Sequence, residues 1–307
     1  MKLLHTFSIV ARDAQSGHLG VAVQTHWFAV GALCPWAEAG VGVVATQSMV
    51  QVSYGPLGLE QMRQGKSAQQ ALNDLLAKDE QAALRQVAMI DAAGNVAVHS
   101  GERCIAQAGH LQGEGYSVQA NMMLNDTVWP AMAAAYEESQ GDLAERMLAA
   151  LKAAQASGGD IRGKQSACML VVDNQKSEHP WEHVLVNVRV DDHPEPIKEL
   201  ERLLNIQKAY FYMDEGDALL SKDQTEEAMQ QYAKAAALAP HLVELPFWQA
   251  VTLAESKRLD EALPIFKEVF EQDSNWVELL KRLPAAGLLK VDKRVLEQIL
   301  AQKTSEK

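Results

Sequence analysis

A hydroxyl residue opens the first apolar run of the sequence and is the candidate with the clearest nucleophilic chemistry. Thr6 begins the run TFSIVARD, and Ser8 follows two residues later. Side chains alternate between the two faces of a strand, so we expect Thr6 and Ser8 to point to the same side and to share a pocket. A hydroxyl becomes a good nucleophile only when a base removes its proton. In an uncut chain, His5 or His26 would have to supply that base.

Other common motifs of catalysis and binding are absent from the sequence. There is no phosphate-binding loop ending in Gly-Lys-Ser/Thr and no G-x-S-x-G serine elbow. Gly113 and Gly115 form a G-x-G that lacks the third glycine of a dinucleotide site. His179 and His183 have the spacing of helical zinc ligands, but Pro180 and a strand-like continuation argue against a helix there. We therefore expect neither a cofactor nor a metal ion.

Charge and composition exclude several classes of partner. The chain has 28 basic and 40 acidic residues, a net charge of −12, with −5 over residues 1–190 and −7 over residues 191–307. Neither part has the surplus of Lys and Arg that neutralises phosphates, so no nucleic-acid partner is expected. No apolar run is long enough to span a bilayer, which predicts no membrane partner. Three widely spaced cysteines and a poor secretory signal predict a reduced, cytoplasmic protein.

Short strands bracket two helical stretches in the first 190 residues. The helices are expected over 58–77, with a break at Gly65, and over 128–156, with a break near Gly141. Strand and helix do not alternate regularly, so the order favours an α+β fold of antiparallel sheets covered by helices. Turn residues over 13–18 and 92–95 predict hairpins. The strands are expected at 4–11, 19–25, 42–46, 86–91, 96–100, 116–119, 167–172 and 183–190.

The last part of the sequence repeats itself with a period of 34 residues. This offset aligns Gly216 with Ala250 and Tyr232 with Phe266, which resembles the tetratricopeptide repeat. A pair of ordinary helical hairpins in chance register is the alternative. Two prolines in the polar segment 191–196 predict a linker, so we expect one domain over 1–190 and an all-α domain over 197–307. Helices are expected near 206–221, 224–238, 242–256, 260–272 and 292–302.

The first 190 residues contain several longer motifs: TFSIVARD, LGVAVQTHWFAVGALCPWAEAGVGVVATQ, SYGPLGLE, GERCIAQAGH, VQANMM and GGDIRGKQSA. These motifs resemble the family catalogued as domain of unknown function 1028, which is placed among the N-terminal-nucleophile hydrolases. The resemblance covers nearly all of residues 1–190 and implies a four-layer αββα sandwich.

The resemblance implies a mechanism in which the nucleophile is the first residue of the mature chain and its own α-amine is the base. A free α-amine has a pKa of about 8, close to the working pH. Thr6 is then the nucleophile. The resemblance suggests catalytic roles for Ser8, Gln47, Asn121, Asp160 and Ser166. It suggests contact with the substrate for His26, Ser48, Tyr54, Arg162 and Gln165. Each of these polar residues also suits an ordinary structural role at the end of a strand or in a loop.

Two functions remain open from the sequence. The first is hydrolysis of an amide (C–N) bond in a small, non-peptide-like molecule. It requires that the His5–Thr6 bond be cut, by the chain itself or by a protease, because removing Met1 alone does not free the amine of Thr6. The second is a non-catalytic scaffold of the same fold, whose helical repeats over 197–307 bind a protein partner or mediate self-association.

Overall fold

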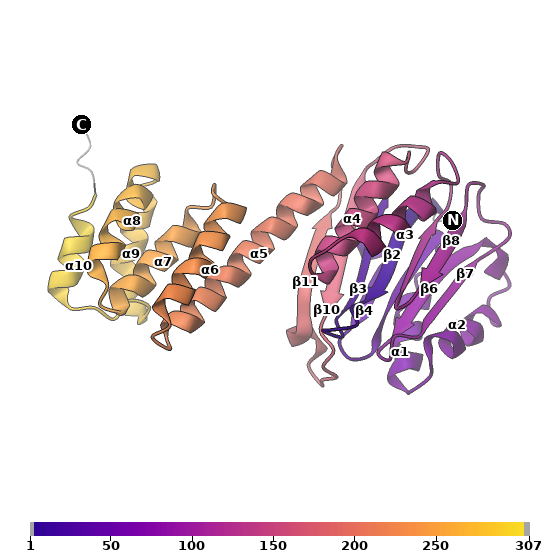
Figure 1. The fold of residues 1–307 in the computed structure, drawn as a ribbon, viewed down its shortest axis with the longest axis horizontal. Helices are drawn as coiled ribbons and strands as arrows, with labels where there is room; N and C mark the ends of the chain where they lie inside the picture. The colour runs from indigo at the N-terminus through magenta and orange to yellow at the C-terminus, as the bar shows by residue number, and fades with distance from the viewer. Residues whose placement is uncertain (1–2, 304–307) are drawn as a thin grey trace. The chain divides into compact units, whose positions relative to one another are not determined.

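The computed structural model describes residues 3–303, with only the backbone for residues 3 and 4, and divides the chain into two compact units, Met1–Leu203 and Leu204–Lys307. The first unit is a mixed α+β structure with two antiparallel sheets, and the second is entirely helical (Figure 1). The division falls inside one helix, α5 (Pro196–Leu220), which begins where the sequence predicts the end of a linker. The α+β class predicted from the sequence is confirmed.

The larger sheet has six strands in the order β11-β10-β3-β2-β9-β8. Its central strands β2 and β3 are buried along almost their whole length, as is typical of strands covered on both faces. The turn at residues 13–18 joins β2 to β3 as an antiparallel hairpin, as predicted. The strands are β2 (Thr6–Arg12), β3 (Leu19–Thr25), β8 (Gly109–Gly113), β9 (Tyr116–Ala120), β10 (Ser166–Val172) and β11 (Val184–Val190).

The second sheet follows the order β1-β5-β6-β7, and β4 also pairs with β5. Asp91 accepts hydrogen bonds from the backbone N–H groups of Ala93 and Asn95, which closes the predicted hairpin between β6 and β7. Gly94 has a φ of 91° in this turn, a conformation that favours glycine. The strands are β1 (Leu3–Leu4), β4 (Pro35–Glu38), β5 (Gly42–Met49), β6 (Arg85–Asp91) and β7 (Val96–Ser100).

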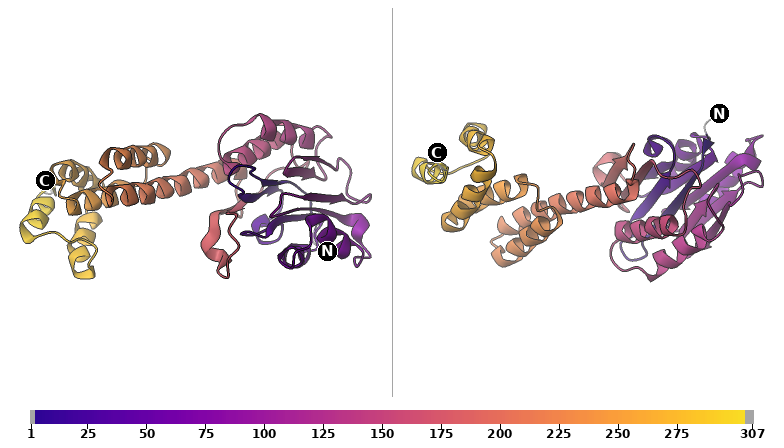
Figure 2. Two further views of the ribbon diagram at one scale, coloured as in Figure 1. Left: turned by 60° about the horizontal axis from the view of Figure 1, so that its bottom comes forward. Right: turned by 90° about the horizontal axis from the view of Figure 1, so that it is seen from above.

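Two helices cover the outer face of each sheet. α1 (Tyr54–Arg63) and α2 (Ala68–Leu76) pack on β5, β6 and β7, and α3 (Val128–Glu138) and α4 (Leu143–Ala156) pack on β2, β3, β8 and β9. The left view of Figure 2 shows these pairs on opposite sides of the strands. Both predicted breaks are present, because Gly65 and Gly141 take positive φ between the paired helices. Ser67 and Asp142 then begin α2 and α4 with capping boxes.

The facing surfaces of the two sheets are apolar at one end and polar at the other. Val10, Val21 and Val23 of the larger sheet pack against Val43 and Ile90 of the other. At the end where β2 and β5 carry Thr6 and Gln47, the facing side chains are instead hydroxyl and amide groups with almost no exposure. Buried polar groups are costly unless they are hydrogen-bonded, so this end of the interior must be a connected network.

The helical unit packs its helices through the small and aromatic residues of the 34-residue period. Gly216 of α5 lies against Tyr232 of α6, and a Cβ built on Gly216 would come within 2.5 Å of the ring. Phe247 of α7 contacts Phe266 of α8 edge-on. The remaining helices are α6 (Thr225–Leu238), α7 (Glu244–Glu255), α8 (Leu259–Gln272), α9 (Asn275–Ala286) and α10 (Lys293–Leu300). Of these, α9 was not predicted from the sequence. None of the helices in the described residues is both long and apolar enough to cross a bilayer.

Candidate functional site

Three neighbouring strands of the larger sheet place a row of hydroxyl groups at one level. Thr6 of β2 is directly opposite Thr25 of β3, and Thr25 is directly opposite Ser166 of β10. Directly opposed residues of antiparallel strands point to the same face, so these hydroxyls lie on one side of the sheet. Ser8 hydrogen-bonds to Gln47 of the second sheet, which identifies that side as the interior between the sheets. The sequence analysis did not single out Thr25.

The carbonyl oxygen of His5 lies between two hydrogen-bond donors. Thr25 Oγ1 donates to it at 2.5 Å and Arg162 Nη2 donates to it at 2.9 Å. This carbonyl belongs to the His5–Thr6 peptide bond, and it is adjacent to the nitrogen of Thr6. A hydroxyl and a guanidinium held at this distance are the type of donor pair that stabilises negative charge developing on a carbonyl oxygen.

Asp160 holds Arg162 in this position. Its two carboxylate oxygens accept from Arg162 Nε at 3.0 Å and Arg162 Nη2 at 2.7 Å, a bidentate pair that fixes the plane of the guanidinium. The Asp160 side chain is fully buried, whereas that of Arg162 is about a quarter exposed. Asp160 also accepts from the backbone N–H of His26, and so ties the loop after β3 to the same group. The pairing with Asp160 therefore keeps the Arg162 guanidinium directed at the His5 carbonyl.

A network of side-chain amides fills the interior next to Thr6. Gln86 Oε1 accepts from Gln47 Nε2 at 2.7 Å and from Asn121 Nδ2 at 2.9 Å. Ser8 donates to Gln47 and accepts from Gln119 Nε2, with 2.6 Å in both cases. These five residues come from strands β2, β5, β6 and β9 and the residue after β9, so the network joins the two sheets.

The same amides also hold the backbone of Thr6. The Thr6 carbonyl oxygen accepts from the backbone N–H of Asn121 at 3.1 Å and from Gln47 Nε2 at 3.2 Å. The predicted residues Gln47 and Asn121 are thus brought to Thr6. Gln86 and Gln119, which the sequence analysis missed, complete the network. Their only sequence signal is an uncharged polar residue at an inward position of an otherwise apolar strand.

The imidazole of His5 is buried beside this network and is neutral at pH 7. Its Nδ1 hydrogen-bonds to Asn121 Oδ1 at 2.8 Å, and its Nε2 is buried with no partner. Burial lowers the pKa of His5, and the positive charge of Arg162 adds to this, against the opposing effects of Asn121 and Asp160. A neutral imidazole is chemically able to accept a proton.

Residues 3 and 4 reach the site along the second sheet. Leu3 and Leu4 form the short strand β1, which pairs with Met49 and Ser48 of β5. Ser48 has a left-handed backbone, with a φ of 69°. A positive φ is unusual for serine and is held in place by its surroundings. The segment that precedes Thr6 therefore runs along one sheet before the chain enters the other.

The other predicted site residues lie at the margin or outside this site. Ser166 accepts from the N–H of Val30 and donates to the carbonyl of Trp27, so it holds the loop after β3. The His26 side chain is exposed. Gln165 donates to Asp192 on the surface. Tyr54 lies on the opposite face of the second sheet, in the α1–α2 core, where it donates to Asp79.

Exposed apolar side chains border the site where the loops meet. Met122, next to Asn121, donates from its backbone to Ile105 and accepts from the N–H of Ile161, so these three segments are joined. Ile105 and Ile161 are 43 % and 58 % exposed, and the nearby Leu124 is 56 % exposed. Exposed apolar residues that lie together are a common feature of surfaces that contact a ligand or partner.

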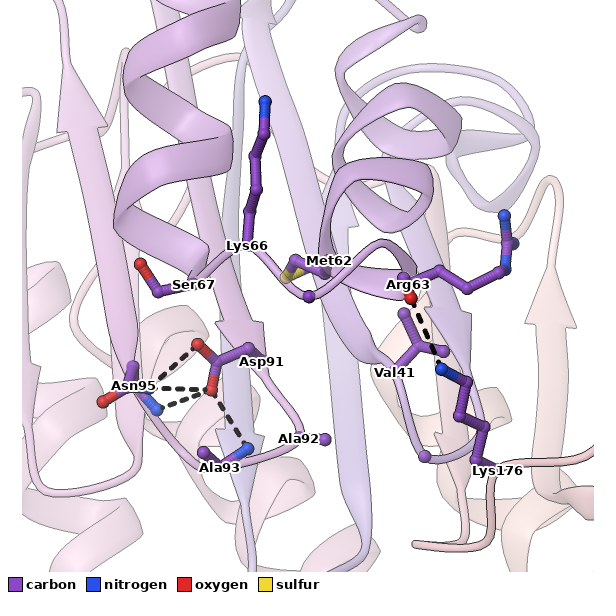
Figure 3. A pocket seen from close by; sticks show the side chains of 12 residues that line it. Val41, Met62, Arg63, Lys66, Ser67, Asp91, Ala92, Ala93, Asn95 and Lys176 are labelled. Carbon is purple, nitrogen blue, oxygen red and sulfur yellow. Dashed lines mark hydrogen bonds between the residues drawn. The ribbon is translucent and has the colours of Figure 1, made fainter.

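A separate hollow of about 290 Å³ lies between the end of α1 and the β6–β7 hairpin (Figure 3). Its carboxylate, Asp91, is already engaged by the N–H groups of Ala68, Ala93 and Asn95. Lys176 donates to the carbonyl of Arg63. These groups close turns and helix ends, so the hollow offers little free chemistry. Among the described residues, no group of three His, Cys, Asp or Glu side chains is arranged to hold a metal ion.

The fold and site define a class: α+β proteins in which two facing antiparallel sheets, covered by helices, enclose a polar interior at the first residue of a central strand. The chain belongs to the family of unknown function DUF1028, whose model matches residues 6–200. It is similar to the crystal structure of protein SPO2555 from Silicibacter pomeroyi, which belongs to the same family. The two are 31 % identical with a TM-score of 0.59, over 65 % of this chain and 84 % of that one. No curated protein matches the chain.

Proposed function

We propose that the first unit is an amide-bond hydrolase of the N-terminal-nucleophile type, acting on a small molecule, with Thr6 as nucleophile. The observation that carries this proposal is the His5–Thr6 peptide bond, whose carbonyl oxygen accepts from both Thr25 and Arg162. The order helix pair, sheet, sheet, helix pair also supports the four-layer αββα sandwich that this class of hydrolases has. Thr6 lies at the start of a central strand and is fully buried beside the amide network.

Maturation requires one cleavage, which the residues around Thr6 are suited to perform. Thr6 Oγ1 attacks the carbonyl carbon of His5, and the developing oxyanion is stabilised by Thr25 and Arg162. The C–N bond then breaks, the hydroxyl proton ends on the Thr6 nitrogen, and His5 is left as an ester on Thr6 Oγ1. Water hydrolyses this ester, which gives a carboxylate on His5 and a free hydroxyl and α-amine on Thr6.

The mature chain then repeats the same steps on a substrate amide. The α-amine of Thr6, with an ordinary pKa of about 8, accepts the hydroxyl proton and passes it to the leaving nitrogen. Gln47 and Asn121 hold the Thr6 backbone through its carbonyl oxygen, so the nucleophile does not move when the preceding residues leave. Asp160 keeps Arg162 directed at the carbonyl that is attacked.

The state of residue 6 tests this proposal directly. Intact mass and N-terminal sequencing of the wild-type chain are expected to show a mature protein that starts at Thr6. Thr6→Ala removes the nucleophile and is expected to leave the chain uncut and without amidase activity. Thr6→Ser keeps a hydroxyl and is expected to be cut and active.

Circular dichroism of all three chains controls for folding, since Thr6 is buried. A folded Thr6→Ala chain that is cut between residues 5 and 6 like the wild type would remove the self-cleavage step. A wild-type chain that stays uncut and hydrolyses an amide at the same rate as Thr6→Ala would overturn Thr6 as nucleophile.

A second candidate function is binding through the helical unit, which the tetratricopeptide-like period supports. Phe211 of α5 is 64 % exposed, which is unusual for phenylalanine. As the alternative to catalysis, we propose self-association or binding of a protein partner through residues 197–307. Sedimentation of the full chain, of Phe211→Ser and of residues 1–203 tests self-association, which is expected to be lost in the last two. Equal sedimentation behaviour, after correction for mass, would contradict it.

A further inference from the structure

The edge of β5 is covered by two short segments that differ in how they are attached. β4 covers Gly42–Ala45 and continues in the body of the unit, whereas β1 covers only Ser48 and Met49. β1 is joined to the rest of the unit through the His5–Thr6 bond. When that bond is cut and residues before Thr6 leave, the backbone groups of β5 at Ser48 and Met49 lose their partner strand. An open strand edge pairs readily with another extended backbone.

The ester intermediate connects this edge to the substrate. During self-cleavage the segment ending in His5 is bound as an ester to Thr6 Oγ1, and during hydrolysis the acyl part of the substrate is bound to the same atom in the same way. Both acyl groups are therefore in contact with the same residues while they are bound to Thr6 Oγ1. These are the β5 edge, the Asn121 side chain and the donors Thr25 and Arg162.

We propose that β5 at Ser48–Met49 is the acyl-side subsite of the enzyme and that the substrate is a short linear peptide or peptidyl amide in extended conformation. This inference rests on the proposed function. The peptide pairs antiparallel with β5 as β1 does. Its carbonyl next to the amide that is cut accepts from Thr25 and Arg162, and its last side chain carries a hydrogen-bond donor for Asn121 Oδ1.

Two observations favour a peptide over a compact acyl group, and so over the non-peptide-like substrate expected from the sequence. Backbone pairing with β5 requires at least two consecutive peptide units, which a simple acyl group does not have. The left-handed conformation of Ser48 is also held at the position where β1 pairs, and strain of this kind is retained where the surroundings fix a binding geometry. The exposed apolar border formed by Ile105, Leu124 and Ile161 offers contact area beside the same site.

A binding measurement tests the proposed subsite independently of catalysis. The probe is the peptide Lys-Leu-Leu-His, titrated by calorimetry into the full mature chain that begins at residue 6. If the wild type is uncut, this chain is prepared from a tagged form with a protease that removes the tag and residues 1–5, so that residue 6 becomes the N-terminus. The control peptide has methyl groups on the nitrogens of both leucines, which removes the backbone donors and keeps the side chains. We expect the unmodified peptide to bind at least ten times more tightly than its methylated form.

Turnover supplies the second measurement. Leu-Leu-His and acetyl-His, each coupled to aminomethylcoumarin through its carboxyl group, are compared on the same chain. We expect a KM at least ten times lower for the longer substrate. Equal binding of both peptides, or no binding of either, would overturn the peptide subsite. Equal KM values with good turnover would overturn it too, while leaving the hydrolase proposal intact. Selective binding without any hydrolysis would support the subsite and refute the hydrolase.

Discussion

Gln86 is the residue through which the interior next to Thr6 is held together. Its oxygen accepts from Gln47 and Asn121, and its nitrogen donates to Ser100 at 2.7 Å and to the carbonyl of Ala120 at 2.9 Å. One neutral amide thus satisfies groups from both sheets without placing a charge in the interior. An uncharged network of this kind leaves Arg162 and Asp160 as the main charged pair next to the His5 carbonyl.

Gln86→Ala is expected to lower the free energy of unfolding by about 3 kcal/mol. It leaves a space in the interior, which is costly in itself, and it removes the shortest hydrogen bond of two buried N–H₂ groups, which then keep only longer bonds to backbone carbonyls, among them that of Thr6. Each lost hydrogen bond contributes about 1 kcal/mol. Urea unfolding of the full chain measures the loss. Gln112→Ala is the matched control, because Gln112 is exposed, and it is expected to change stability by less than about 0.5 kcal/mol. Equal effects of the two substitutions would contradict the role of Gln86.

His5 gives the uncut chain a dependence of stability on pH. Burial lowers its pKa in the folded state, so between that value and 6.5 the unfolded chain binds more protons than the folded chain. The stabilisation is complete above pH 6.5 and is lost as the pH falls through the folded-state pKa. In a Thr6→Ala background, which keeps His5 attached, acid is expected to destabilise the chain more than its His5→Gln counterpart. Parallel melting temperatures of the two chains from pH 7.5 to 5 would contradict this.

At the level of elements, local signals predicted most of the fold, and the elements that were missed have weak or misleading local signals. The breaks at Gly65 and Gly141 and eight strands were visible because glycine conformations and runs of apolar residues are local properties. β8 was missed because GHLQG has one large apolar residue and forms an edge, and α9 was missed because Pro284 suggests a break that falls only in its last turn.

The candidate site was predictable only in part, because some of its contacts depend on how distant strands pair. Thr6, Gln47, Asn121 and Arg162 lie at strand ends or in loops, where motif resemblance could point to them. Thr25 contacts the His5 carbonyl only because β3 pairs with β2 in one particular register, and no periodicity reveals that contact.

The crossing of α5 and α6 depends on the absence of a side chain at Gly216. Alanine inside a helix is normally more stable than glycine by about 1 kcal/mol. At Gly216 the added Cβ would lie 2.5 Å from the buried ring of Tyr232, and overpacking costs about 1–3 kcal/mol. Gly216→Ala is therefore expected to lower the stability of the helical unit by about 1 kcal/mol, as measured by thermal unfolding followed by circular dichroism. In a Tyr232→Leu background the same change is expected to be neutral or stabilising. A loss of equal size in both backgrounds would contradict the clash.

At the level of the whole molecule, the groups described above around the His5–Thr6 bond all belong to the first unit. Thr25, Asn121, Asp160 and Arg162 precede the division at residue 203. Both parts of the chain have a negative net charge, so neither part favours a polyanionic partner.

A chain of residues 1–203 is therefore expected to cut itself between His5 and Thr6 at the same rate as the full chain. Intact mass measured at intervals after synthesis gives the rate, and Thr6→Ala in the shorter chain is the control. A shorter chain that has the circular dichroism of a folded α+β unit, and that stays uncut while the full chain is cut, would show that the helical unit is needed for the chemistry.

The path of residues 3–6 has a consequence for whether the protein can refold after it has been cut. β1 pairs within one sheet and β2 begins the other, so the His5–Thr6 bond is a covalent connection between the two sheets. Once the bond is cut and the residues before Thr6 have left, a chain that unfolds must refold without this connection and without the pairing of β1 with β5, both of which are present while the uncut chain folds. The cut form would then show hysteresis between unfolding and refolding curves. Its lifetime would be set by the height of the unfolding barrier rather than by an equilibrium that it can return to.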